Sequence, residues 1–174
     1  CLLSAFAWFT AKGAEMGDVV LAANAVLLML QSFMAYGLDG FAHAAEALIG
    51  SAVGSRDRST FRKAARATTL WAVIVALGFT AFYLVFGTSL IALMTDIDAV
   101  RLAAEAFLPW MILSPLISVW GFQFDGIFIG ATDTAPLRNS MVVALVIFIL
   151  AVWLLVPVFG NHGLWLAFIA FMGL

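Results

Sequence analysis

The chain has 174 residues, of which 65% are hydrophobic and 10% are charged, and its formal net charge at pH 7 is −2. Soluble domains are typically about a quarter charged, so this chain has too few polar side chains to cover a water-facing surface. Its mean hydropathy of +1.12 points to an integral membrane protein. The net negative charge gives no indication of a nucleic-acid partner, and a single cysteine excludes an internal disulfide.

Charge-free windows locate the expected membrane spans, because a helix needs about 20 mostly apolar residues to cross the hydrocarbon core. A β-barrel is not expected, since its strands would alternate apolar and polar residues, whereas these windows are apolar on all faces. We predict an all-α, polytopic membrane protein that is truncated at both ends, because the chain starts and stops inside apolar runs. The expected helices cover residues 1–11, 19–53, 61–87, 99–131, 135–157 and 162–174.

The breaks between the expected helices differ in their basic residues, which predicts the orientation of the chain. The breaks alternate between the two sides of the membrane, and the side with more Lys and Arg is cytoplasmic. The second and fourth breaks, around 54–60 and 132–138, are therefore predicted to be cytoplasmic. They and the adjoining helix turn hold six of the eight basic residues: Arg56, Arg58, Arg62, Lys63, Arg66 and Arg138. This topology alone explains the group from Arg56 to Arg66, which could also contact anionic lipid.

Asp39, His43 and Glu46 form a polar stripe on the second expected helix, within about 60° of one another by helical periodicity. Because an ionised carboxylate in hydrocarbon is costly, these groups are expected to face a wet cavity, to pair or to be held neutral. Alternatively, Glu46 is solvated near the headgroups, since Arg56 is only about 15 Å of helix away. His43 and Glu46 alone do not make a metal site, so no metal is expected. The same periodicity places two more polar residues near this face, Asn24 and Ser32.

Asp125 is a second charged residue in an apolar setting, near the predicted cytoplasmic end of the fourth expected helix. Small residues on its face would let a neighbouring helix approach closely, which explains glycine and serine there but not a carboxylate. Helical spacing places four residues on that face: Gly121, Ser118, Ser114 and Met111. We therefore expect a substrate or ion cavity with these candidate residues: Asp125, Asp39, Glu46, His43, Ser114, Ser118 and, from another face, Gln123.

Two stretches resemble a known family, the multidrug and toxic compound extrusion (MATE) transporters. Residues 37–50, GLDGFAHAAEALIG, with the turn 54–57, GSRD, resemble the second helix and following turn of one lobe, in the wording of the DinF-type branch. Residues 122–134, FQFDGIFIGATDT, resemble the family's tenth helix and its exit turn. Ala131 and Thr132 stand where many members have an Arg-Gly pair, a departure that suits the DinF-type branch.

The resemblance implies a twelve-helix protein with two six-helix lobes around a central cavity. This chain would supply about helices seven to twelve, the C-terminal lobe, and would partner an N-terminal lobe of the same protein. The implied function is a secondary active antiporter that exports small cationic or lipophilic drugs by alternating access, in exchange for protons or sodium ions, without another cofactor. The position of Asp125 corresponds to an acidic cavity residue in several members.

Two other functions stay open at this point. A lipid-linked oligosaccharide flippase of the same superfamily would need a cationic cavity for a pyrophosphate, whereas the intramembrane charges here are acidic. An intramembrane enzyme would need a catalytic constellation. The sequence contains no His-Glu-x-x-His, no Gly-x-Ser-x-Gly and no phosphate loop, so we do not expect an enzyme.

Overall fold

The computed structural model describes residues 2–174, which form six α-helices and no strand. The helices are α1 (Leu2–Glu15), α2 (Asp18–Gly54), α3 (Arg58–Met94), α4 (Asp98–Gly130), α5 (Thr134–Phe159) and α6 (Asn161–Gly173). Four of them, α2 to α5, are long and apolar enough to cross a membrane. The predicted all-α, polytopic membrane fold is therefore confirmed.

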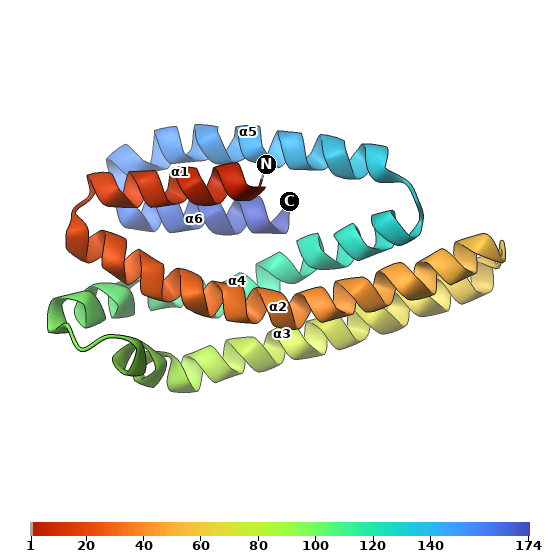
Figure 1. Cartoon of the computed structure of the whole chain (residues 1–174), viewed down its shortest axis with the longest axis horizontal. Coiled ribbons are helices and arrows are strands. Elements are labelled where there is room, and N and C mark those ends of the chain that lie inside the picture. Colours follow the sequence, from red (N-terminus) through yellow and green to blue (C-terminus); the bar gives the residue numbers. More distant parts are fainter. Residues whose placement is uncertain (1) are drawn as a thin grey trace.

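Successive helices run in opposite directions, so that their connecting turns alternate between two ends of the molecule (Figure 1). The turns after α2 and α4 lie at one end, and the turns after α1, α3 and α5 lie at the other. The α2–α3 turn and the α4–α5 turn therefore lie at the same end, as two loops on one side of a membrane would.

The N-terminus of α3 is fixed by a side-chain cap. The carboxylate of Asp57 accepts hydrogen bonds from the Thr60 hydroxyl and from the backbone N–H groups of Thr60 and Ser59, which would otherwise lack partners at the start of a helix. These bonds, that of the Thr60 hydroxyl foremost, lower the pKa of Asp57 below its usual 3.8. This cap explains why α3 begins at Arg58, three residues before the expected start at 61.

The other end of α3 lies further along the chain than expected, at Met94 rather than near residue 87. Gly87 is buried, and a Cβ there would collide with the side chain of Leu108 in α4. This glycine therefore permits close packing of α3 on α4, and it does not end the helix.

The helices pack as two groups: α2 with α3 and α4, and α1 with α5 and α6 (Figure 1). α4 joins the groups mainly through its contacts with α6. Between α2 and α4, a Cβ at Gly126 would overlap the backbone of Ala42, and one at Gly130 would overlap the backbone of Glu46. Two glycines spaced by four residues thus bring the two helix backbones into contact, as in other membrane-helix pairs.

A buried polar group, which we call the asparagine clamp (Asn24, Asn161 and Trp165), ties α2 to α6. The two asparagine side chains exchange hydrogen bonds, each of 2.8 Å, and the Trp165 indole N–H donates to the Asn24 Oδ1 at 2.9 Å. All three side chains are nearly or fully buried. Reciprocal pairing of this kind satisfies polar groups that would be costly to leave unpaired inside the fold.

Candidate functional site

The polar stripe predicted on α2 is present and forms one local group. His43 lies between two carboxylates: its Nε2 is 3.3 Å from Asp39 Oδ2, and its Nδ1 is 3.5 Å from Glu46 Oε2. The side chains of Asp39 and Glu46 are 49% and 43% exposed, and that of His43 is 71% exposed. These groups therefore lie at the surface of the described chain.

Asp125 of α4 lies close enough to Asp39 for their negative charges to interact. The glycine contact explains this proximity, since Gly126 abuts Ala42, three residues after Asp39. Asp125 is itself partly buried. The structure thus brings together four of the predicted residues, which we call the acidic cluster: Asp39, His43, Glu46 and Asp125.

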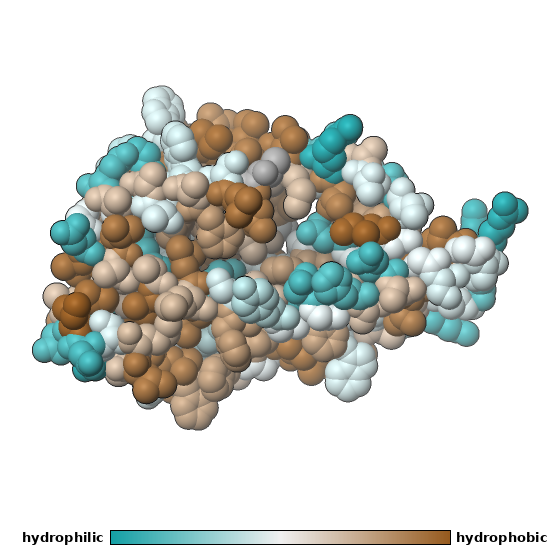
Figure 2. Space-filling model, viewed as in Figure 1, coloured by the Kyte–Doolittle hydropathy of each residue, from teal (hydrophilic) through white to brown (hydrophobic). Residues whose placement is uncertain are grey.

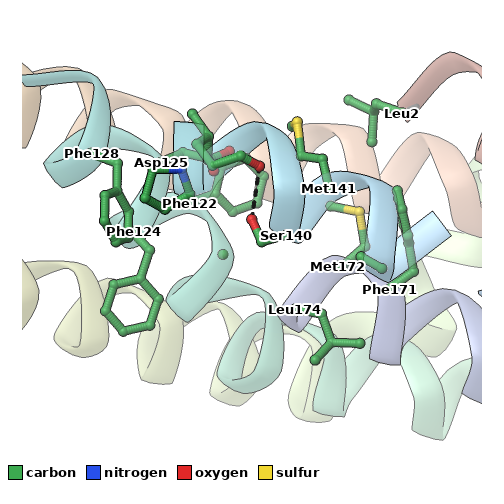
Figure 3. A pocket seen from close by; sticks show the side chains of 14 residues that line it. Leu2, Phe122, Phe124, Asp125, Phe128, Ser140, Met141, Phe171, Met172 and Leu174 are labelled. Atoms are coloured by element: carbon green, nitrogen blue, oxygen red, sulfur yellow. Dashed lines mark hydrogen bonds between the residues drawn. The ribbon is translucent and has the colours of Figure 1, made fainter. Parts of the chain in front are cut away.

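Asp125 also contributes to a cavity of about 390 Å³ between α4, α5 and α6. Its wall is mostly apolar and includes the chain-end residues Leu2 and Leu174. Figure 3 shows Phe122, Phe124 and Phe128 on the same side as Asp125, with Met141, Met172 and Leu174 on the other. The remaining lining residues are Gly121, Pro136, Leu137, Ser140, Ala144 and Phe171.

The acidic cluster and the cavity differ from the rest of the surface. Figure 2 shows hydrophilic side chains gathered over the middle of α2, in a face that is otherwise largely apolar. A carboxylate beside aromatic rings can bind a positively charged organic molecule, because the charge attracts the cation and the ring faces stabilise it further. The arrangement is therefore suited to a cation, inorganic or organic.

A family model described as MatE matches residues 2–154 of the chain. The chain belongs to the MatE family. It is 44% identical over 169 residues to DNA damage-inducible protein F of Escherichia coli (strain K12), covering 97% of this chain and 37% of that protein. It is 29% identical over 164 residues to Protein DETOXIFICATION 42 of Arabidopsis thaliana, covering 92% of this chain and 31% of that protein.

These matches confirm the predicted family resemblance, including the DinF-type branch. The chain spans about a third of the length of the curated relatives that it matches. Family membership and the four membrane-crossing helices together identify an integral membrane protein.

The structure of this MatE chain separates three other predicted cavity residues from the acidic cluster. Ser114 and Ser118 have no exposed surface, and the Ser114 hydroxyl donates to Gln31 Oε1 of α2 at 2.7 Å. Gln123 is buried too, and its Nε2 donates to the Thr68 hydroxyl of α3 at 2.7 Å. The predicted face is thus divided: neighbouring helices cover its first part, and only its last part, at Gly121 and Asp125, reaches the cavity.

Asn24 and Ser32, which periodicity places near the same face as Asp39, are not part of the acidic cluster. Asn24 belongs to the asparagine clamp, and the Ser32 hydroxyl donates to the Leu28 carbonyl of its own helix at 2.9 Å. Helical periodicity places residues on a face but does not tell which neighbour covers each turn.

Sequence reasoning missed Gln31, whose long amide in a charge-free window was a signal for a buried hydrogen bond. Its hydrogen-bond partner Ser114 was predicted, but as a cavity residue on the face of Asp125 and not as a buried partner of Gln31. The α5 and α6 side chains that line the cavity carry no distinctive sequence signal, because they are ordinary apolar residues. Within residues 2–174, no three His, Cys, Asp or Glu side chains are placed to hold a metal ion.

Proposed function

We propose that the full-length protein is a secondary active antiporter that exports small cationic or lipophilic drugs in exchange for protons or sodium ions. This chain would form its C-terminal six-helix lobe and would face an N-terminal lobe across a central cavity. The observation that carries the proposal is the proximity of Asp39 and Asp125 on adjacent, largely apolar helices that are in backbone contact at Gly126 and Ala42. Membership of the MatE family supports it.

Two nearby carboxylates provide a simple means of exchange. Their mutual repulsion is relieved by any positive charge placed between or beside them, whether a proton, a sodium ion or an organic cation. Because one positive charge reduces the attraction for the next, the coupling ion and the substrate would compete for the same negative potential. This competition links the binding free energies of the two ligands.

His43 would moderate this potential, since it lies between Asp39 and Glu46. Its two ring nitrogens lie 3.3 Å and 3.5 Å from these carboxylates, so the ring is placed to hold them apart. The proposal therefore assigns the whole cluster to cation attraction and places Asp125 nearest the apolar cavity.

The test measures dye binding by the full-length protein after neutralising either of two carboxylates of α4, Asp125 or Glu105. Asp125→Asn should weaken binding of a cationic dye and flatten the pH dependence of its binding, because the side chain can no longer exchange a proton for the dye. Glu105→Gln, at an exposed position near the opposite end of α4, should match the wild type. Dye affinity would be measured against pH in nanodiscs. Equal affinities and equal pH profiles for Asp125→Asn and the wild type would contradict the role of Asp125.

For orientation, we propose that the loops around 54–60 and 132–138 face the cytoplasm across a bacterial inner membrane. The biased distribution of Lys and Arg supports this orientation. In a full-length variant without native cysteines, single cysteines at Ser59 and Ile97 should react with an impermeant reagent from opposite sides. Reaction of both from outside the cell would contradict the orientation.

The alternatives are less well supported. MatE relatives argue for a transporter and against an intramembrane enzyme. A flippase for a pyrophosphate-linked lipid would need cations where the described part of the chain has Asp39, Glu46 and Asp125. Export of a cationic dye by proteoliposomes containing the full-length protein would support the antiporter over both.

A further inference from the structure

Five basic residues gather on the α2–α3 turn and the first turns of α3: Arg56, Arg58, Arg62, Lys63 and Arg66. All five are exposed. The ion pairs found between residues 2 and 174 involve other residues, so none of the five has a carboxylate within 4.0 Å. The nearest acid in sequence, Asp57, is occupied as the cap of α3. The basic cluster therefore carries uncompensated positive charge that an anion would relieve.

Three of these cations surround a hollow. Arg58, Arg62 and Lys63, together with Ser59, line a shallow depression of about 400 Å³ on α3. Arg58 and Arg62 are separated by four residues, as are Ser59 and Lys63, so the four side chains project from adjacent turns of the helix. Two guanidinium groups, an ammonium group and a hydroxyl offer a phosphate several donors on one side.

An apolar stripe continues along α3 from the Lys63 side of this hollow, while Arg58 and Arg62 flank it. Lys63, Arg66, Leu70, Ile74 and Leu77 share one face by helical periodicity. Leu70, Ile74 and Leu77 are 58%, 45% and 53% exposed, and no charged residue occurs from Ala67 to Thr95. Cations followed by exposed aliphatic side chains along one face match the order of a phospholipid, a phosphate headgroup and then acyl chains.

The length of α3 indicates that the boundary between the basic cluster and the apolar stripe is near the membrane surface. With 37 residues, α3 is about 55 Å long, whereas the hydrocarbon core is about 30 Å thick. We therefore expect the charged first turns to lie outside the hydrocarbon, and Trp71, which is exposed five residues after Arg66, is of the residue type enriched at the interface.

We propose that this face of α3 binds an anionic phospholipid, with its phosphate in the hollow formed by Arg58, Arg62 and Lys63 and its acyl chain along Leu70 and Ile74. A soluble phosphate compound would use only the hollow and would leave the apolar stripe without a role. The bound lipid neutralises part of the basic cluster and fixes the depth of α3 in the leaflet. This inference does not depend on the transport function.

The experiment measures lipid retention by the full-length protein. Protein in nanodiscs with increasing fractions of phosphatidylglycerol in phosphatidylcholine would be released for native mass spectrometry, and bound phosphatidylglycerol would be counted. Each cation near an anionic surface changes the affinity about fivefold, so the double variant Arg62→Gln/Lys63→Gln should bind about twenty-five-fold more weakly. Arg62→Lys, which keeps the charge, should stay within a few-fold of the wild type.

Arg138→Gln is the matched control, because Arg138 is an exposed cation in the first turns of α5, at the same end of the molecule but outside the basic cluster. It should weaken retention by at most about fivefold, the effect of one cation near an anionic surface. Unchanged retention in the double variant, or an equal loss in Arg138→Gln, would overturn the site. Displacement of the lipid by millimolar glycerol phosphate would show that the hollow recognises a soluble phosphate, which would also overturn the lipid assignment.

Discussion

The asparagine clamp and the acidic cluster both contain polar side chains of α2, but they differ in charge, burial and hydrogen bonding. In the asparagine clamp the groups are neutral and buried, and they exchange hydrogen bonds with α6. In the acidic cluster they are ionisable and about half exposed or more, and the charge of Asp39 acts on that of Asp125 on the neighbouring helix. The asparagine clamp has its hydrogen bonds satisfied within the fold, whereas we propose that the unbalanced charge of the acidic cluster attracts a cation. Substitutions should therefore affect stability in the first and binding in the second.

The largest effect is expected where the packing that positions the acidic cluster is disturbed. Gly126→Ala would place a Cβ against the Ala42 backbone, forcing α2 and α4 apart and costing about 2–3 kcal/mol of unfolding free energy. Gly40→Ala is the control, since a Cβ there meets nothing within 4 Å. Unfolding in denaturing detergent would compare the two full-length variants. Equal stability would show that the α2–α4 contact is looser than described.

The asparagine clamp should respond next most strongly. Asn24→Leu removes three hydrogen bonds and should cost about 2 kcal/mol, because hydrogen bonds between membrane helices contribute roughly 0.6 kcal/mol each and somewhat more when a partner is left unpaired. Cation affinity should not change. Asn139→Leu, at an exposed position on α5, provides the control in the same detergent unfolding assay. A loss of cation affinity without a loss of stability would contradict the structural role.

Asp39→Asn should lower cation affinity without lowering stability, the reverse of Asn24→Leu. Because Asp39 is about half exposed and repels Asp125, its neutralisation should leave the unfolding free energy within about 0.5 kcal/mol of the wild type. Affinity for a cationic dye should fall about fivefold, as expected for losing one attraction of about 1 kcal/mol, and efflux should fall at a normal protein level. If expression collapses instead, Asp39 is a structural residue and the comparison fails.

The smallest effect concerns Asp57, an exposed carboxylate whose hydrogen bonds are all local. Its pKa is lower in the folded chain than its usual 3.8, so its stabilisation is fully present above about pH 4. The stabilisation is lost as the pH falls through the lowered pKa. Hydrogen-exchange protection of the Ser59 and Thr60 amides should therefore decline on acidification in the wild type. Asp57→Asn should show no such decline, and identical profiles would contradict the cap.

Composition and charge-free windows were sufficient to predict six helices and the alternation of their turns. The end of α3 was missed because Gly87 looks like a helix breaker in sequence but serves as a contact point for Leu108. The acidic stripe of α2 followed from spacing within one helix. Its proximity to Asp125 depends on which helices pack together, and sequence periodicity carries no information on that pairing.

The serines of α4 illustrate the same limit. Ser114 and Ser118 share a face with Asp125 by periodicity, yet Gln31 covers the first of them and only the last turns of that face reach the cavity. Ser114 is covered by Gln31 of α2, and the sequence of α4 holds no information about that contact. Local chemistry was therefore predictable from sequence, and long-range pairing was not.

The α2–α3 hairpin extends past the other helices at its turn (Figure 1), and each of its two helices has 37 residues. Two helices packed side by side over about 55 Å behave as a stiff lever. If the lobe rocks by 10° about the middle of the bilayer, the tip near Ser55 moves by about 5 Å, while residues at the pivot hardly move. In the two-lobe antiporter that we propose, a pair of spin labels at this tip and on the N-terminal lobe would therefore report rigid-body rocking with more sensitivity than labels placed beside the acidic cluster.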